Sequence, residues 1–160
     1  MYSSFELGLR YIQYWLKSSN AKGHGIHSPF VFDLIDTVFT DDRNFYVFPL
    51  IEEVREELLF NNTPIEVTDF GAGSRINQHY TRTISSIAKS ALKPKKFSQL
   101  LFRMVNHFGS STILELGTSF GITTSYLAAA NQNGFVITME GAPEIAKQAQ
   151  RHFQHIGLHN

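Results

Sequence analysis

The chain has 160 residues, 42% of them hydrophobic and 18% charged, and its 14 basic and 14 acidic side chains give a net charge of zero. This length and composition fit one folded domain and exclude a disordered protein. The balanced charge gives no global attraction to nucleic acids or membranes. The absence of cysteine excludes disulfides, thiol catalysis and cysteine metal sites. We expect neither a secretory leader nor a membrane span, and hence a cytoplasmic protein.

The first two thirds of the chain carry mainly helical patterns. Ser28 followed by Pro29 predicts a cap and the first residue of a helix, and Pro49 indicates another helix start. Gly109 is a typical helix stop after an apolar stripe that runs from Phe97 to Phe108. The predicted elements of this region are helices over 3–17, 29–39, 50–60, 81–92 and 94–108, and a short strand over 65–70.

Strands and helices alternate from Ser111 onward. The apolar run Thr112–Leu116 predicts a buried strand that ends in a glycine turn, and a helix follows the turn. A second apolar run, Phe135–Met139, predicts the next strand, and Pro143–Ile156 predicts a helix that Gly157 ends. This alternation predicts an α/β fold with a Rossmann-like parallel sheet.

Two carboxylates flank the glycine turn in the sequence. Glu115 lies two residues before the first glycine, Gly117, and is suited to a cationic ligand rather than to a diphosphate. Gly121 has no Cβ, so we expect the start of the helix to lie close to a ligand. Glu140 ends the second strand, about 20 residues further on, where a carboxylate can accept the hydroxyl hydrogens of a ribose. These positions predict one half of a nucleotide-type binding site.

The turn LELGTSFG at 114–121 resembles that of class I S-adenosylmethionine (SAM)-dependent methyltransferases. It is similar to the catechol-type O-methyltransferases and to a related, largely uncharacterised group of bacterial methyltransferases. The resemblance covers about 94–158, and the segment GHGIHSPF at 23–30 also looks like the bacterial group. It implies SAM as the cofactor and a small-molecule methyl acceptor with an oxygen nucleophile, while the catalytic base stays unassigned.

The resemblance also implies roles for individual residues. The main chain of 117–121 would cradle the methionine end of SAM, with Glu115 near its ammonium group and Glu140 on its ribose. Thr118 and Ser119 would add hydroxyl contacts, and Gly141, with the alanine after it, would leave room for the adenine. A plain βα connection, with each carboxylate in a structural role, is the alternative at every one of these positions.

Two other classes of function stay open. One is a nucleotide-dependent oxidoreductase, although Ser119 occupies the middle glycine position of the dinucleotide motif G-x-G-x-x-G. The other is a non-catalytic assembly or regulatory domain that has kept a methyltransferase turn.

The resemblance implies a larger sheet than the two strands predicted after Ser111. We therefore expect an N-terminal portion of a longer protein, with a mainly helical region over 1–92 and the beginning of a SAM-binding domain over 93–160. The activity of this portion alone is left open. Two parallel strands do not make a doubly covered sheet, so an open sheet edge is a candidate site for homo-oligomer formation.

Two further groups of residues are candidates for the acceptor side of the site. Asp69, Gly71 and Gly73 form a second acidic glycine turn, for which the end of a hairpin or short strand is favoured over a lid on the acceptor side. His24 and His27 are candidates for the acceptor side, but two histidines without nearby carboxylates make a weak ligand set, so no metal site is predicted. The basic stretch over 75–103 is typical of solvated helix faces, and nucleic-acid binding is not expected.

Overall fold

The computed structural model describes residues 4–17, 27–68 and 79–160. The chain divides into two compact units, 1–42 and 43–160. Each unit is considered by itself, and the candidate site belongs to the second. In the described ranges, no helix is long and apolar enough to cross a membrane.

The described part of the first unit is helical. It contains α1 (Ser4–Lys17), α2 (Pro29–Leu34) and a π-helical turn, η1 (Ile35–Phe39). The Ser28 hydroxyl oxygen accepts a hydrogen bond from the Val31 amide at 3.4 Å, and Pro29 stands in the first turn of α2. The predicted cap and proline start are therefore confirmed, and the predicted helix continues to Phe39 with a change to π geometry.

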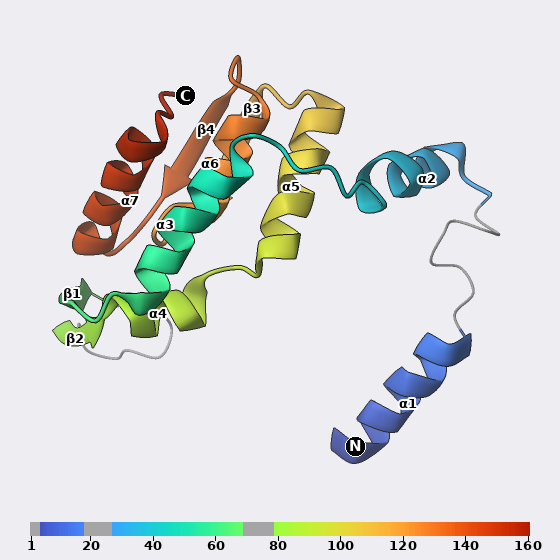
Figure 1. The fold of residues 1–160 in the computed structure, drawn as a ribbon, viewed down its shortest axis with the longest axis horizontal. Helices are drawn as coiled ribbons and strands as arrows, with labels where there is room; N and C mark the ends of the chain where they lie inside the picture. Colours follow the sequence, from blue (N-terminus) through green and yellow to red (C-terminus); the bar gives the residue numbers. More distant parts are fainter. Residues whose placement is uncertain (1–3, 18–26, 69–78) are drawn as a thin grey trace. The chain divides into compact units, whose positions relative to one another are not determined.

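The second unit is a mixed α/β arrangement. Its described residues form five α-helices and two two-stranded sheets (Figure 1). In chain order the elements are α3 (Phe48–Phe60), β1 (Pro64–Thr68), β2 (His79–Thr83), α4 (Ile84–Ala91), α5 (Lys95–Phe108), β3 (Thr112–Leu116), α6 (Ile122–Ala130), β4 (Phe135–Met139) and α7 (Pro143–Ile156).

The first sheet corrects one prediction. A helix was expected over 81–92, but β2 pairs antiparallel with β1, from Pro64 opposite Thr83 to Thr68 opposite His79. The β-branched threonines of this segment suit a strand, and the strand partner lies far enough away in sequence that a local pattern does not reveal it. Helix α4 begins only after Thr83, whose hydroxyl oxygen accepts a hydrogen bond from the Ser86 amide at 3.2 Å.

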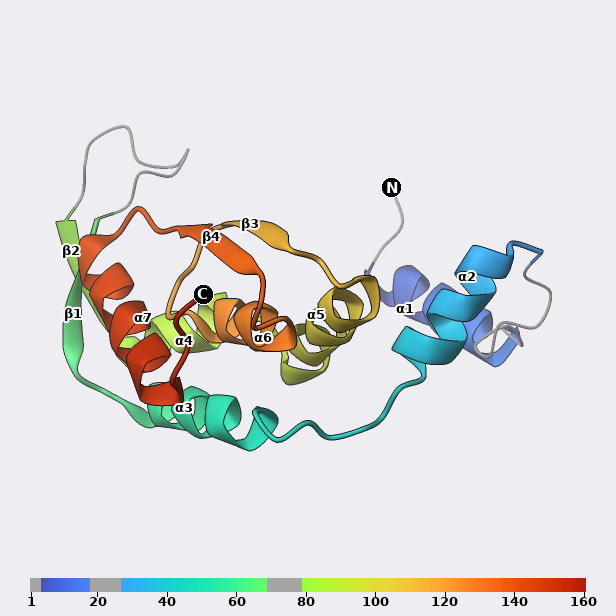
Figure 2. The same cartoon turned by 90° about the horizontal axis from the view of Figure 1, so that it is seen from above.

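The second sheet is the predicted βαβ unit. Strands β3 and β4 pair in parallel, from Thr112 opposite Phe135 to Leu116 opposite Met139, and α6 connects them. Helices α6 and α7 lie on one side of the two strands (Figure 2). The prediction of a buried strand is not met: the residues that face α6 and α7 are half-buried, and no described element of the unit covers the opposite face. The side chains exposed there are Leu114, Leu116, Phe135, Ile137 and Met139.

The hydrophobic core lies among the helices on the covered side of β3 and β4. Aromatic rings of Phe48, Phe102 and Tyr126, on three different helices, meet with centroids 5.0–5.2 Å apart. Helix α3 contributes Ile51 and Val54, which are fully or almost fully buried. Helices from before and after residue 92 share this core, and the two compact units divide at residue 42.

A buried arginine ties the start of α5 to α3. The Arg55 guanidinium donates to the Lys93 carbonyl at 2.7 Å, to the Glu52 carboxylate at 3.0 Å and to the Ser98 hydroxyl at 3.5 Å. The Tyr126 hydroxyl donates to the same Glu52 oxygen at 2.8 Å, and burial together with this carboxylate raises the pKa of Tyr126. This network fixes the segment before α5, which forms one wall of the site described next.

Candidate functional site

The glycine turn between β3 and α6 alternates in handedness. Gly117, Ser119 and Gly121 have φ angles of 94°, 50° and 80°. A left-handed serine is uncommon and costs free energy, so the surrounding structure must hold it in place. Two hydrogen bonds fix the turn to β4. The amides of Gly117 and Thr118 both donate to the Met139 carbonyl, at 2.9 and 3.0 Å. The turn is thus fastened to the carboxyl end of the neighbouring strand, where α/β sheets bind ligands.

Gly121 has a different role from the one predicted. A Cβ at this position would lie 2.5 Å from Cε1 of Phe153 and 3.2 Å from Cβ of Ala149, both on α7. The missing side chain therefore makes room for α7. At Gly117, by contrast, a Cβ would meet open space. Of the two glycines, Gly117 is the one that leaves main chain uncovered.

Glu115 is part of a chain of hydroxyl groups. Its Oε2 atom accepts from the hydroxyls of Thr124, at 2.5 Å, and Thr138, at 2.8 Å. The Thr138 oxygen in turn lies 2.6 Å from the Thr118 hydroxyl. Since Thr138 donates its single proton to the carboxylate, Thr118 must donate to Thr138. Among the described residues, the other carboxylate oxygen, Oε1, has no hydrogen-bond partner.

Glu140 holds the other side of the turn. Its Oε2 atom accepts from the Ser119 amide at 2.7 Å, and its Oε1 atom accepts from the Ala142 amide at 3.0 Å. Each oxygen of a carboxylate can accept two hydrogen bonds, so one acceptor position on each oxygen is left. The carboxylate is consequently fixed by the main chain and still able to bind a pair of hydroxyl groups.

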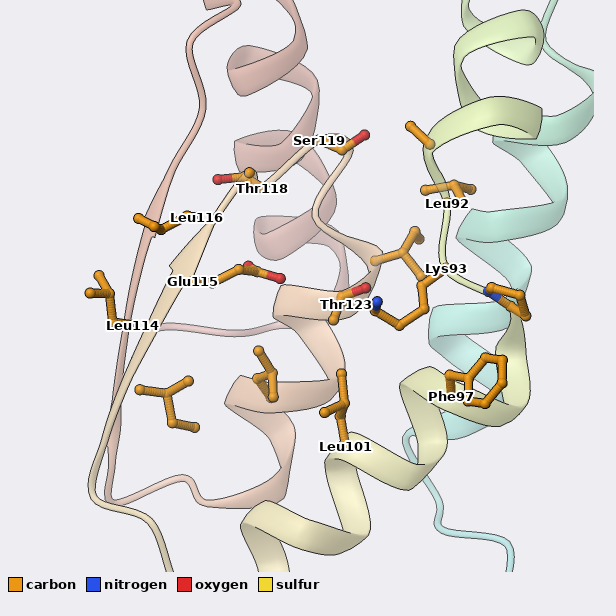
Figure 3. A pocket seen from close by; sticks show the side chains of 16 residues that line it. Leu92, Lys93, Phe97, Leu101, Leu114, Glu115, Leu116, Thr118, Ser119 and Thr123 are labelled. Atoms are coloured by element: carbon orange, nitrogen blue, oxygen red, sulfur yellow. The ribbon is translucent and has the colours of Figure 1, made fainter. Parts of the chain in front are cut away.

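A hollow of about 630 Å³ opens beside the turn, between β3, α6 and the start of α5. Figure 3 shows Glu115 reaching from β3 towards α6, with Lys93 and Phe97 on the opposite wall. Of the predicted site residues, the hollow brings together four: Glu115, Gly117, Thr118 and Ser119. Glu140 and Gly141 do not line it, and Glu140 meets the lining only through its bond to the Ser119 amide.

Ser119 contributes an unsatisfied polar atom. Its hydroxyl oxygen is buried and has no hydrogen-bond partner within the described chain. A buried hydroxyl in this state loses hydrogen bonds to water without replacement, and such groups are uncommon in folded proteins. The combination with the left-handed backbone makes Ser119 the most constrained residue of the turn.

The sequence did not indicate some residues of the hollow. The sequence places Lys93 in a solvated basic stretch, and Phe97 and Leu101 in an apolar helix stripe, yet all three line the hollow. Phe97 is 46% exposed. Lys93 directly precedes a proline that starts a helix, but this signal predicts only a helix boundary and no function.

His152 on α7 contacts the main chain of the turn. Its Nδ1 atom lies 2.9 Å from the Phe120 carbonyl, which can only accept, so Nδ1 carries the proton. Burial lowers the pKa of His152 despite this bond. The neutral ring therefore acts as a fixed donor between α7 and the turn.

The structure does not describe most of the remaining candidates. His27 is exposed, while His24, Asp69, Gly71 and Gly73 lie outside the described residues. No group of three or more metal-ligating side chains occurs in the ranges that the structure covers. No protein-family model matches the chain, and no curated protein is found to be similar to it. The functional argument therefore depends on the geometry of the turn and its two carboxylates.

Proposed function

We propose that the β3–α6–β4 unit is the SAM-binding part of a Rossmann-like methyltransferase that acts on an oxygen atom of a small molecule. One observation carries the proposal. The two carboxylates predicted from sequence lie on either side of the same left-handed turn, Glu115 with a free oxygen beside the hollow and Glu140 bonded to the Ser119 amide.

The residues present fit this cofactor. Glu115 Oε1 is an unused anionic acceptor, as the ammonium group of the methionine moiety requires. The Ser119 hydroxyl is a buried polar atom without a partner, and it can bond the same moiety. Gly117 leaves its main chain uncovered. Glu140 keeps one acceptor position on each oxygen for the two ribose hydroxyls, and Gly141, which follows it, would face the adenine.

The charge of the site favours a cationic ligand over a diphosphate. A dinucleotide site offers free main-chain amides at the start of the helix. Here the amides of Gly117, Thr118 and Ser119 donate to acceptors within the protein, and one of these acceptors is the Glu140 carboxylate. An incoming phosphate would meet negative charge at the place where it needs donors. A nucleotide-dependent oxidoreductase therefore gains no support from the turn.

SAM, when bound, supplies an already activated methyl group on a sulfonium. The work left to the chain is to position an acceptor in line with that group and to exclude water. Phe97 and Leu101 give the hollow an apolar wall suited to this task, and Lys93 adds a single positive charge at its rim. These features suit a small organic acceptor.

Calorimetric titration of the full 160-residue chain with S-adenosylhomocysteine, which measures the heat of binding, tests the proposal. Glu140→Gln should weaken binding by about 10–100-fold, because it replaces charge-assisted hydrogen bonds worth about 1.5–3 kcal/mol. Glu53→Gln, on the exposed face of α3, is the matched control and should bind like the wild type. Absence of heat with a folded wild-type chain would refute the proposal, and thermal stabilisation by NAD instead would favour the oxidoreductase.

A further inference from the structure

The Glu115 carboxylate is held by only one of its two oxygens. Thr124 on α6 and Thr138 on β4 both donate to Oε2, at 2.5 and 2.8 Å. Because the two donors belong to different elements, the carboxylate cannot rotate without losing at least one of these bonds. The other oxygen, Oε1, stays without a partner among the described residues, on a side chain that lines the hollow.

The two donors are themselves fixed by the βαβ unit. Thr138 lies directly opposite Glu115 in the parallel register of β3 and β4, so both side chains are on the same face of the sheet. Thr124 is in the first turn of α6 and is buried. Threonine is branched at Cβ and has few χ1 rotamers, and the Thr138 hydroxyl is also bonded to that of Thr118 in the turn. The orientation of Glu115 is therefore set before a ligand binds.

We infer that Thr138 and Thr124 are positioning residues that orient Glu115 for the recognition of a ligand's amino group. The inference rests on the proposed function, since it assumes that the amino-acid end of SAM binds at Glu115. An ammonium group has three donors and no acceptor, and Oε1 offers it an acceptor whose orientation is already fixed. A carboxylate that is immobilised in advance loses less conformational entropy when the ligand binds.

A ligand without an amino group provides the contrast. 5′-Methylthioadenosine has the adenosine part and the sulfur of S-adenosylhomocysteine, but it lacks the amino-acid end. Loss of a threonine hydroxyl should therefore weaken the binding of S-adenosylhomocysteine alone. If the threonines only stabilised the fold, their loss would weaken the binding of both ligands by the same factor. The ratio of the two dissociation constants consequently separates positioning from stability.

Calorimetric titration of the full chain with each ligand tests the inference. Thr138→Val, which keeps the shape of the side chain and removes its hydroxyl, should raise the Kd of S-adenosylhomocysteine about 3–10-fold, equivalent to about 0.7–1.4 kcal/mol, and leave that of methylthioadenosine unchanged. Thr124→Val should act in the same direction. Thr138→Ser, which keeps the hydroxyl, should bind both ligands like the wild type. Thr112→Val, an exposed position at the other end of β3, is the matched control and should change neither constant.

The possible failures of the inference and of the proposed function are distinguishable. Equal weakening of both ligands by Thr138→Val, or no weakening of either, would overturn the inference and leave the proposed function in place. Thr138→Ser that binds as weakly as Thr138→Val would also overturn it, because the effect would then belong to the methyl group. A wild-type chain that is folded and binds no S-adenosylhomocysteine would refute the proposed function and this inference together.

Discussion

The replacement Gly121→Ala tests whether the turn is shaped by α7 or by a ligand. The new Cβ would lie 2.5 and 2.7 Å from two ring carbons of Phe153, which is closer than any ordinary carbon contact. It would also sit on a backbone with φ of 80°, a conformation that disfavours every residue with a side chain. Two separate costs therefore act at this position, a backbone cost and a packing cost.

Each cost has a rough magnitude. A left-handed alanine costs about 1–2 kcal/mol relative to glycine. Overpacking of a filled site costs about 1–3 kcal/mol more. Gly121→Ala should therefore lower the free energy of unfolding by about 2–5 kcal/mol. Gly117→Ala carries the backbone cost alone, because its φ is 94° and its Cβ would meet open space. It should cost about 1–2 kcal/mol.

Urea unfolding followed by far-UV circular dichroism measures these differences. The double variant Gly121→Ala/Phe153→Leu separates the two costs further, because the shorter leucine removes the ring that the Cβ meets. We expect the Gly121→Ala replacement to cost less in the Phe153→Leu background than in the wild type, which is a coupling measured by a double-mutant cycle. Equal costs for Gly117→Ala and Gly121→Ala, with no coupling to Phe153, would refute the packing explanation.

Three further changes test other parts of the structure. Arg55→Met should lower the free energy of unfolding by about 2–4 kcal/mol, because it leaves the Lys93 carbonyl without its donor and the Glu52 carboxylate without its cation, whereas Lys147→Met, in an exposed ion pair, should cost less than about 1 kcal/mol in the same urea assay. Burial holds the pKa of His152 below its ordinary 6.5, so the unfolded chain takes up the proton first and the melting temperature should fall as pH drops below about 6.5. His152→Gln should reduce this slope, and an unchanged slope would contradict the assignment. Thr138→Val removes the hydroxyl that binds Glu115 and should cost about 1–2 kcal/mol in urea unfolding, while Thr138→Ser should restore most of the loss; equal losses would point to the methyl group instead.

Elements with local start and stop signals could be predicted from sequence. The proline at the start of α7 and the left-handed Gly157 at its end bound the helix as expected, and Gly109 ends α5 in the same way. Such signals act within one turn of the helix, so they need no knowledge of the rest of the fold. The order of β3, α6 and β4 could also be predicted, because the residue pattern that indicates each strand or helix lies within that element.

The burial of these elements was harder to predict. The stripe assigned to α5 ends in Phe97 and Phe108, which are about half exposed, whereas Phe102 is almost fully buried. More than one face of this helix carries apolar residues. Which face is buried depends on the aromatic partners on α3 and α6. In the same way, β3 and β4 carry apolar residues on both faces, and only their partners in space decide which face is covered.

The positions of the two carboxylates on the strands could be predicted, but their contacts could not. Spacing placed Glu115 and Glu140 at the ends of adjacent strands, where the structure has them. The partners of Glu115 on the next helix and strand, Thr124 and Thr138, carry no signal in a single sequence. The link from Gly121 to α7 was also hidden, because a glycine needed for packing and one needed for a ligand look identical in the sequence.

The row of hydroxyls behind Glu115 gives the hollow a fixed electrical polarity before anything enters it. Thr124 and Thr138 can point their protons only at the carboxylate, and Thr118 follows suit, so no member of the row is free to turn a proton towards a guest. A ligand with hydrogen-bond donors can bind the Glu115 carboxylate without any rearrangement of these hydroxyls. A group that brings only lone pairs finds no donor in this row, so anions are disfavoured beside Glu115, and the donors left for them in the hollow include the Ser119 hydroxyl and Lys93.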